Sequence, residues 1–150
     1  HMEGITPESA LVALPSQSIM VSRQQIDQAI ESLSDKDAEI DFISLGCPHL
    51  SILEIQRLAK LLEGRQVRRE FWITTSRAVK ALADRAGYSQ VIEASGAKFA
   101  VDTCCVVAPI RGRFKTLLTD SAKACYYASS KNKFKTVYKS FDEVVQEALR

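Results

Sequence analysis

Short apolar runs alternate with helix-forming segments along the 150 residues of the chain, and this alternation limits the possible folds more than any other feature. Strands that alternate with helices of this length favour a mainly parallel sheet with right-handed crossovers and helices on both faces. We therefore predict an α/β fold, in a three-layer αβα arrangement. The predicted strands are residues 40–45, 71–74, 98–101, 106–108, 116–118 and 135–138.

Capping boxes mark the start of several helices. Ser22 with Gln25 resembles one such box, and Ser51 with Glu54 resembles a second. In this motif a serine and a residue three positions later each bond the other's backbone N–H group. Gly64 is a stop signal for the second of these helices. The predicted helices run from residue 22 to 33, from 51 to 64, from 75 to 87, from 90 to 94 and onward from 140.

The predicted elements follow one another without a linker, an internal repeat or a low-complexity tract. We expect one α/β domain over residues 3–150, and we interpret His1 and Met2 as a cloning remnant. With 46% hydrophobic residues the chain can bury one core. It has no apolar stretch long enough to cross a bilayer and no signal-peptide pattern, so we expect a cytoplasmic protein without a membrane partner.

The charge of the chain gives no reason to expect a nucleic acid partner. Its 20 basic and 18 acidic residues leave a formal net charge of +2, whereas a domain that binds nucleic acid carries a strongly basic face. Basic residues gather at 65–69 and 131–139. We interpret both clusters as solvated surface.

Polar clusters follow four of the predicted strands. They lie at residues 44–49, 74–77, 102–105 and 119–123. In open α/β sheets, ligands bind outside the carboxyl ends of the strands, so we expect these clusters to converge on one edge of the sheet. Two of the clusters carry Cys47 and Cys104. A shared metal or iron-sulfur site is one interpretation of this pair.

The residues alone leave other interpretations open. A single cysteine is commonly a small buried apolar side chain, and a serine or threonine after a strand is commonly only a helix cap. In a reducing compartment Cys47, Cys104, Cys105 and Cys125 are thiols or ligands rather than disulfides. A thiol-redox site has less support, because the chain has no Cys-x-x-Cys motif.

Six short segments of the sequence, taken in their order along the chain, resemble segments of a known protein family. They are GITPE at 4–8, DFISLGCPHLS at 41–51, WITTSR at 72–77, VDTC at 101–104, VVAP at 106–109 and SAKACYY at 121–127. Together they resemble the C-terminal portion of the aconitase X large subunit, over nearly the whole chain. The resemblance implies an aconitase-like domain of a hydro-lyase. Such an enzyme dehydrates a small hydroxylated carboxylate such as 5-phosphomevalonate or cis-3-hydroxy-L-proline.

The resemblance also implies a cofactor and partners. Cys47 and Cys104 match two of the three cysteines that hold the family's iron-sulfur cluster, which we expect to be a 4Fe-4S cluster in the complete enzyme. The third cysteine belongs to an upstream region with no counterpart in this sequence. The implied partners are the remaining large-subunit domains and a small swivelling domain or subunit. The isolated domain is expected to be inactive and to bind a cluster poorly.

Catalytic and substrate-binding residues follow from the same resemblance. Aconitase-like chemistry uses a serine alkoxide to remove the substrate proton, and such an alkoxide needs stabilisation by nearby positive charge or metal. The candidate serines are Ser44, which we rank first, and then Ser76 and Ser121. Arg77 suits a substrate carboxylate, and Lys123 suits a carboxylate or a phosphate. His49 is interpreted either as a group that binds substrate or shuttles a proton, or as a structural residue.

Two cysteines lie outside the implied ligand set. Family members often carry an apolar residue where this chain has Cys105, and adjacent residues of an extended segment point to opposite faces. We therefore expect Cys104 to face the cluster and Cys105 to lie in the core. We expect Cys125 to lie in the core as well. The alternative hypothesis is that Cys125 replaces the third cysteine ligand of the cluster. The alternative function is a stand-alone, non-catalytic α/β binding module whose cysteines are inert.

Overall fold

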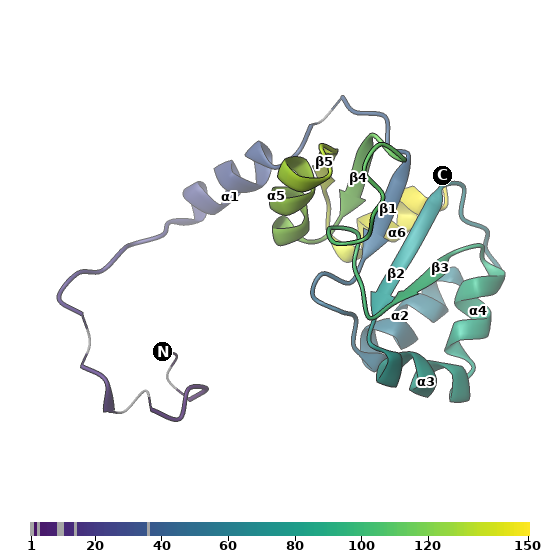
Figure 1. Ribbon diagram of the computed structural model, residues 1–150, viewed down its shortest axis with the longest axis horizontal. Helices are drawn as coiled ribbons and strands as arrows, with labels where there is room; N and C mark the ends of the chain where they lie inside the picture. Colours follow the sequence, from purple (N-terminus) through teal and green to yellow (C-terminus); the bar gives the residue numbers. More distant parts are fainter. Residues whose placement is uncertain (1, 3, 9–10, 14, 36) are drawn as a thin grey trace.

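The computed structural model describes residues 2, 4–8, 11–13, 15–35 and 37–150. The part from residue 42 onward forms one five-stranded sheet with the helices that pack on it (Figure 1). The strands lie in the order β3-β2-β1-β4-β5, and every neighbouring pair is parallel. The predicted α/β fold is confirmed. His1, half of the predicted remnant, lies outside the described residues. The strands are β1 (Phe42–Leu45), β2 (Glu70–Thr75), β3 (Lys98–Val101), β4 (Thr116–Thr119) and β5 (Lys135–Tyr138).

Helices cover both faces of the sheet unequally. They are α2 (Ile52–Leu62), α3 (Arg77–Arg85), α4 (Tyr88–Ala94), α5 (Ala122–Lys131) and α6 (Phe141–Ala148). On one face, α2, α3, α4 and α6 pack with Ile43 and Leu45 of β1 in one buried cluster. On the other face, α5 and the segment 104–114 pack with Phe42 in a second cluster, because neighbouring strand residues point to opposite faces. No described helix is long and apolar enough to span a membrane.

Residues 106–108 do not form the strand that their apolar sequence predicts. The N–H groups of Val107 and Ala108 both donate to the carbonyl oxygen of Cys104, at 3.2 and 3.0 Å. These donors close a local turn, so they are not available to a strand ladder. Val106 packs with the second cluster instead. The predicted strand is therefore wrong, and the apolar residues serve to cover one face of the sheet.

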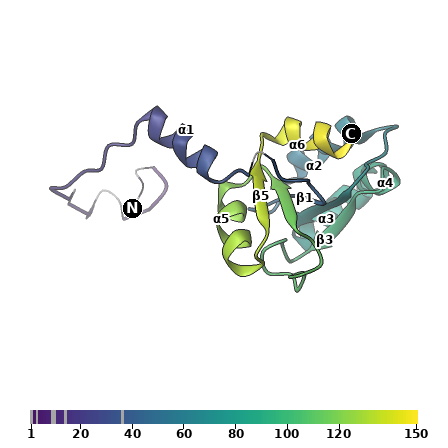
Figure 2. The ribbon, with the colours of Figure 1, turned by 90° about the horizontal axis from the view of Figure 1, so that it is seen from above.

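The N-terminal residues and α1 (Arg23–Ser32) project away from the sheet, as Figures 1 and 2 show from two sides. Ser22 and Gln25 form the predicted capping box, yet α1 has no buried residue. Ile19 and Met20, which precede it, are 91% and 86% exposed. This N-terminal arm, residues 15–32, therefore leaves apolar side chains without cover in the described part of the chain.

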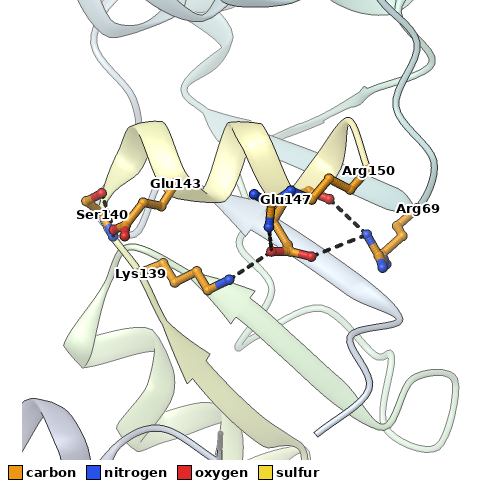
Figure 3. A network of polar contacts seen from close by, with 6 residues as sticks. All are labelled: Arg69, Lys139, Ser140, Glu143, Glu147 and Arg150. Carbon is orange, nitrogen blue, oxygen red and sulfur yellow. Dashed lines mark hydrogen bonds and ion pairs between the residues drawn. The ribbon is translucent and has the colours of Figure 1, made fainter. Parts of the chain in front are cut away.

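A half-buried carboxylate fastens the end of α6 to the sheet (Figure 3). Glu147 Oε2 accepts a hydrogen bond from Lys139 Nζ at 2.8 Å, and Arg69 donates to the backbone carbonyl of Glu147 at 2.8 Å. The Lys139 hydrogen bond and the charges of Lys139, Arg150 and Arg69 hold the pKa of Glu147 below its ordinary value, although burial opposes them. Because Arg69 precedes β2 and Lys139 follows β5, Glu147 joins α6 to two distant parts of the sheet.

We expect Glu147→Gln to lower the free energy of unfolding by about 2 kcal/mol at neutral pH, because charge-assisted bonds to cations are lost. The folded pKa lies below the ordinary value of 4.5. The contribution of Glu147 is therefore complete above that value and is lost as pH falls through the folded pKa. Urea unfolding of both proteins between neutral and acidic pH should show the difference shrinking in acid.

A second carboxylate gives a matched control for this experiment. Glu63 at the end of α2 is exposed, so Glu63→Gln should change the free energy of unfolding by no more than about 0.5 kcal/mol. A constant difference between wild type and Glu147→Gln across the whole pH range would contradict the role given to the Glu147 charge.

Candidate functional site

Four loops leave the sheet at its carboxyl edge. Since β1 to β4 all run in the same direction, the segments that follow them begin at this one edge. Ser44 lies within β1 itself. The other residues that the sequence singled out are in the four loops or in the first turns of the helices that follow. They are Cys47, His49, Ser76, Arg77, Cys104, Ser121 and Lys123.

The loop after β1 is hydrogen-bonded to the end of β2. Thr74 Oγ1 donates to the carbonyl oxygen of Gly46 at 2.5 Å, and Thr75 Oγ1 donates to that of Leu50 at 2.7 Å. The N–H of Leu50 in turn donates to the carbonyl oxygen of Thr74 at 3.0 Å. Gly46 has a φ of 108°, in the region that favours glycine. Buried hydroxyls of β2 thus fix the backbone on both sides of Cys47.

Cys47 lies half-buried among groups from other loops. Burial raises the pKa of its thiol, and a hydrogen bond with the Ser121 hydroxyl opposes this increase. Cys104 and Asp120 raise the same pKa through their charge, whereas Lys123 lowers it. Such effects act over short distances. Cys47, Cys104, Ser121 and Lys123 thus follow three different strands, and the last three are near enough to Cys47 to change the pKa of its thiol.

Asp102 joins Arg77 to the loop that carries Cys104. Asp102 has a φ of 56°, which is uncommon outside glycine and turns the chain sharply after β3. Its Oδ1 accepts the backbone N–H of Arg77 at 2.8 Å, and its Oδ2 lies 3.1 Å from Arg77 Nη2. The Arg77 side chain is still 86% exposed. Asp102 therefore orients the guanidinium group and leaves it accessible to a ligand. The sequence reasoning did not single out Asp102, although an Asp-Thr pair directly after a strand was an available signal.

His49 links the first loop to the third. Its Nε2 lies 2.8 Å from the carbonyl oxygen of Thr103. His49 is two residues beyond Cys47, and Thr103 directly precedes Cys104. The imidazole therefore spans the two loops that present the half-buried thiols.

The three candidate serines occupy different positions. Ser76 and Ser121 are the N-caps of α3 and α5, and their hydroxyls accept backbone N–H groups of the first turns at 3.3 and 3.1 Å. Ser44 is only 2% exposed within β1, and its hydroxyl is hydrogen-bonded with the Cys105 thiol. Ser76 is therefore half-buried, whereas Ser121 and Ser44 are both buried, at 8% and 2% exposure, and Ser44 lies beside Cys105.

Cys105 and Cys125 are buried, at 1% and 0% exposure, in the manner expected for packing residues. Burial raises the pKa of Cys105 to about 12 and that of Cys125 to about 11, although hydrogen bonds with Ser44 and Thr136 offset part of the increase. Both thiols are protonated near neutral pH. Since metals bind the thiolate form, these two residues are poor ligands in this conformation.

The donor set at the edge is incomplete for a metal ion. Cys47 and Cys104 are free and half-buried, and soft sulfur donors of this kind suit iron-sulfur clusters. Within the described ranges, no three His, Cys, Asp or Glu residues are placed to hold a metal together. The two thiols therefore fit part of a cluster site, and a further ligand would have to come from another segment.

Comparison with known proteins identifies the family. Residues 40–150 match the family model described as the aconitase X third domain. The chain belongs to the aconitase X family. This confirms the resemblance that the sequence segments indicated.

Curated aconitase X relatives are dehydratases that are much longer than this chain. The phosphomevalonate dehydratase large subunit of Methanocaldococcus jannaschii is 33% identical over 97% of this chain and 37% of its own length. The corresponding subunit of Thermococcus kodakarensis is 39% identical over 87% and 34%. The cis-3-hydroxy-L-proline dehydratase of Pseudomonas aeruginosa is 36% identical over 85% and 24%. The chain thus spans little more than a third of these proteins at most.

A solved structure of an aconitase X protein contains the same fold. The crystal structure of aconitase X from Thermococcus kodakaraensis, in its holo-form, matches with a TM-score of 0.85 and 36% sequence identity. The match covers 97% of this chain and 38% of that one. The expected aconitase-like domain is confirmed.

Proposed function

We propose that this chain is the cluster-bearing domain of an iron-sulfur hydro-lyase, and that it is inactive on its own. The substrate class is a hydroxylated carboxylate such as 5-phosphomevalonate or cis-3-hydroxy-L-proline, in line with the names of the relatives. The observation that supports the proposal is the 2.8 Å contact of His49 Nε2 with the carbonyl oxygen of Thr103, which joins the loop of Cys47 to the loop of Cys104 at one edge of the sheet.

Cys47 and Cys104 would hold the cluster, with a third thiolate supplied from outside these 150 residues. Both thiols are half-buried and free. Burial raises the pKa of Cys47, and the hydrogen bond with Ser121 and the charge of Lys123 offset part of this increase. When bound through three thiolates, the cluster would supply an iron with an open position, which acts as a Lewis acid on the departing hydroxyl group.

We place proton abstraction at Ser121 rather than at Ser44. A serine alkoxide forms near neutral pH only where positive charge stabilises it. Ser121 caps the N-terminus of α5, where the helix dipole is positive, and Lys123 follows two residues later. Ser76 has the same setting at α3, beside Arg77. The Ser44 hydroxyl instead bonds the buried Cys105 thiol.

Arg77 and Lys123 would hold the negative groups of the substrate. The Arg77 guanidinium can make two parallel hydrogen bonds to a carboxylate, and Asp102 restrains its orientation without covering it. Lys123 supplies a compact charge suited to a carboxylate or phosphate oxygen. The two cations lie in the first turns of two different helices, α3 and α5, so a substrate bound between them would be oriented across the edge.

The remaining large-subunit domains and a small swivelling domain or subunit are the proposed partners. The N-terminal arm supports this part of the proposal, because α1 has no buried residue and Ile19 and Met20 are almost fully exposed. Exposed apolar side chains of this kind commonly mark an interface. The arm would be covered by other domains of the complete large subunit.

We expect trypsin to cut after Arg23 rapidly in the 150-residue chain and slowly in the complete large subunit, because partner domains would cover α1. Mass spectrometry of timed digests measures both rates. Arg57 provides an internal control, since it pairs with Asp142 of α6 at 2.6 Å within the folded domain, and cleavage there should be slow in both proteins. Equal rates at Arg23 in the two proteins would contradict the proposed cover.

The central test is anaerobic reconstitution of the complete large subunit with its small partner, using iron and sulfide. We expect bound iron and sulfide, visible charge-transfer absorbance, and dehydration of one of the two substrates. A complex that binds no iron and dehydrates neither substrate would overturn the proposal. It would favour the alternative, an α/β binding module with inert cysteines.

A further inference from the structure

The contact between His49 and Thr103 joins two loops that are 54 residues apart in sequence. A carbonyl oxygen only accepts hydrogen bonds, so at 2.8 Å the Nε2 atom of His49 must carry the proton and donate it. With Nε2 engaged in this way, that nitrogen is not free to exchange a proton with a substrate. The geometry therefore favours an orienting role for the imidazole.

The Thr103 carbonyl belongs to the peptide unit that leads into Cys104. On its N-terminal side the loop is anchored by Asp102, whose N–H donates to the carbonyl oxygen of Thr75 at 3.0 Å. On its C-terminal side the Cys104 carbonyl accepts the N–H groups of Val107 and Ala108. The peptide unit between these anchors is held from the other loop by His49. Holding that unit restricts the backbone rotation that aims the Cys104 side chain.

The other end of the contact is equally well fixed. His49 lies between Cys47 and Leu50, and Leu50 is 3% exposed and bonded to both Thr74 and Thr75 of β2. The imidazole therefore extends from backbone that β2 already immobilises. The His49 imidazole, on the loop of Cys47, is thus a rigid donor. Its acceptor is the Thr103 carbonyl, which directly precedes Cys104 on the other loop.

We propose that His49 is a positioning residue that sets the spacing between the Cys47 and Cys104 thiols. The proposal rests on the proposed function, because it assigns those thiols to one cluster. His49 itself is exposed, so its replacement removes the tie between the loops without opening the core. The contact of His49 with Thr103 fixes the relative positions of the two cysteines before the cluster binds. Less conformational entropy is then lost on binding.

The test compares His49→Gln with His49→Leu in the complete large subunit, reconstituted with its small partner. Glutamine can place an amide N–H near the position of imidazole Nε2, whereas leucine cannot donate. Groups that orient metal ligands are typically worth 10–100-fold in metal affinity, so we expect His49→Leu to weaken cluster retention against an iron chelator at least about tenfold. His49→Gln should stay within about threefold of wild type and keep dehydratase activity.

A measurement without the cluster separates this proposal from the proposed function. A trivalent arsenical binds two thiols together only when they are close. We expect the iron-free wild type and His49→Gln to bind phenylarsine oxide, and His49→Leu to bind it at least about tenfold more weakly. Iron-free Cys47→Ser sets the background. Unchanged arsenical binding and unchanged cluster retention in His49→Leu would overturn the positioning role.

Two further outcomes are informative. Full cluster retention with loss of activity in both His49→Gln and His49→Leu would assign His49 to proton transfer and also overturn the proposal. Failure of the wild type itself to bind iron, with arsenical binding that still depends on His49, would overturn the proposed function while supporting the tie between the two loops.

Discussion

Cys47→Ser in the complete large subunit is expected to abolish stable iron-sulfur binding, and Cys104→Ser is expected to do the same. A serine hydroxyl is far harder to ionise than a thiol and is a poor ligand for this soft site. With a third thiolate supplied from elsewhere, each substitution removes one of three protein ligands. Dehydratase activity should fall to background, and iron content, acid-labile sulfide and visible absorbance after anaerobic reconstitution should fall with it.

The buried cysteines provide controls of the same chemical type. Cys125 is fully buried, packs in α5 and has a pKa raised to about 11 by burial. Cys125→Ala should cost about 1 kcal/mol of folding stability through the lost sulfur packing, while iron content stays at the wild-type level. Retention of the cluster in Cys47→Ser would remove that residue from the ligand set. Loss of iron in Cys125→Ala with intact folding would instead identify Cys125 as the replacement ligand.

The helices and strands that the sequence predicted correctly are marked by residues close together in sequence. The capping boxes of α1 and α2 form between the expected partners, Ser22 with Gln25 and Ser51 with Glu54, because these bonds join residues only three positions apart. The apolar runs of β1 and β2 were equally clear, since a parallel strand buried on both faces is apolar along its length. Residues 106–108 carry a similar run, and nothing in it distinguishes a strand from a segment that packs on a sheet.

The parts of the site that the sequence did not reveal depend on long-range contacts. The partner of His49 is a backbone carbonyl 54 residues away, and a backbone carbonyl has no sequence signature. Ser44 was ranked first because it precedes Cys47 by three residues. Alternation along β1 instead sends its hydroxyl to the face where Cys105 packs. Which strand face the segment 104–114 covers is decided by the tertiary fold, so the sequence alone could not show that Ser44 is buried against it.

Gly46→Ala is expected to lower the free energy of unfolding by about 4 kcal/mol, from the sum of backbone strain and steric overlap. Gly46 has a φ of 108°, a conformation that residues with a Cβ rarely adopt. A Cβ at this position would overlap the carbonyl oxygen of Thr74 and would lie 2.5 Å from its Oγ1. The backbone carbonyl cannot move aside, because it also accepts the N–H of Leu50.

Gly64→Ala is the matched control. Gly64 also has a positive φ, of 69°, but a Cβ there would meet no atom within 4 Å. The substitution should therefore cost only the left-handed backbone penalty of about 1–2 kcal/mol. Urea unfolding of the two variants compares a position where a Cβ overlaps its neighbours with one where it does not. A Gly46→Ala protein as stable as Gly64→Ala would mean that the loop after β1 can move away from Thr74.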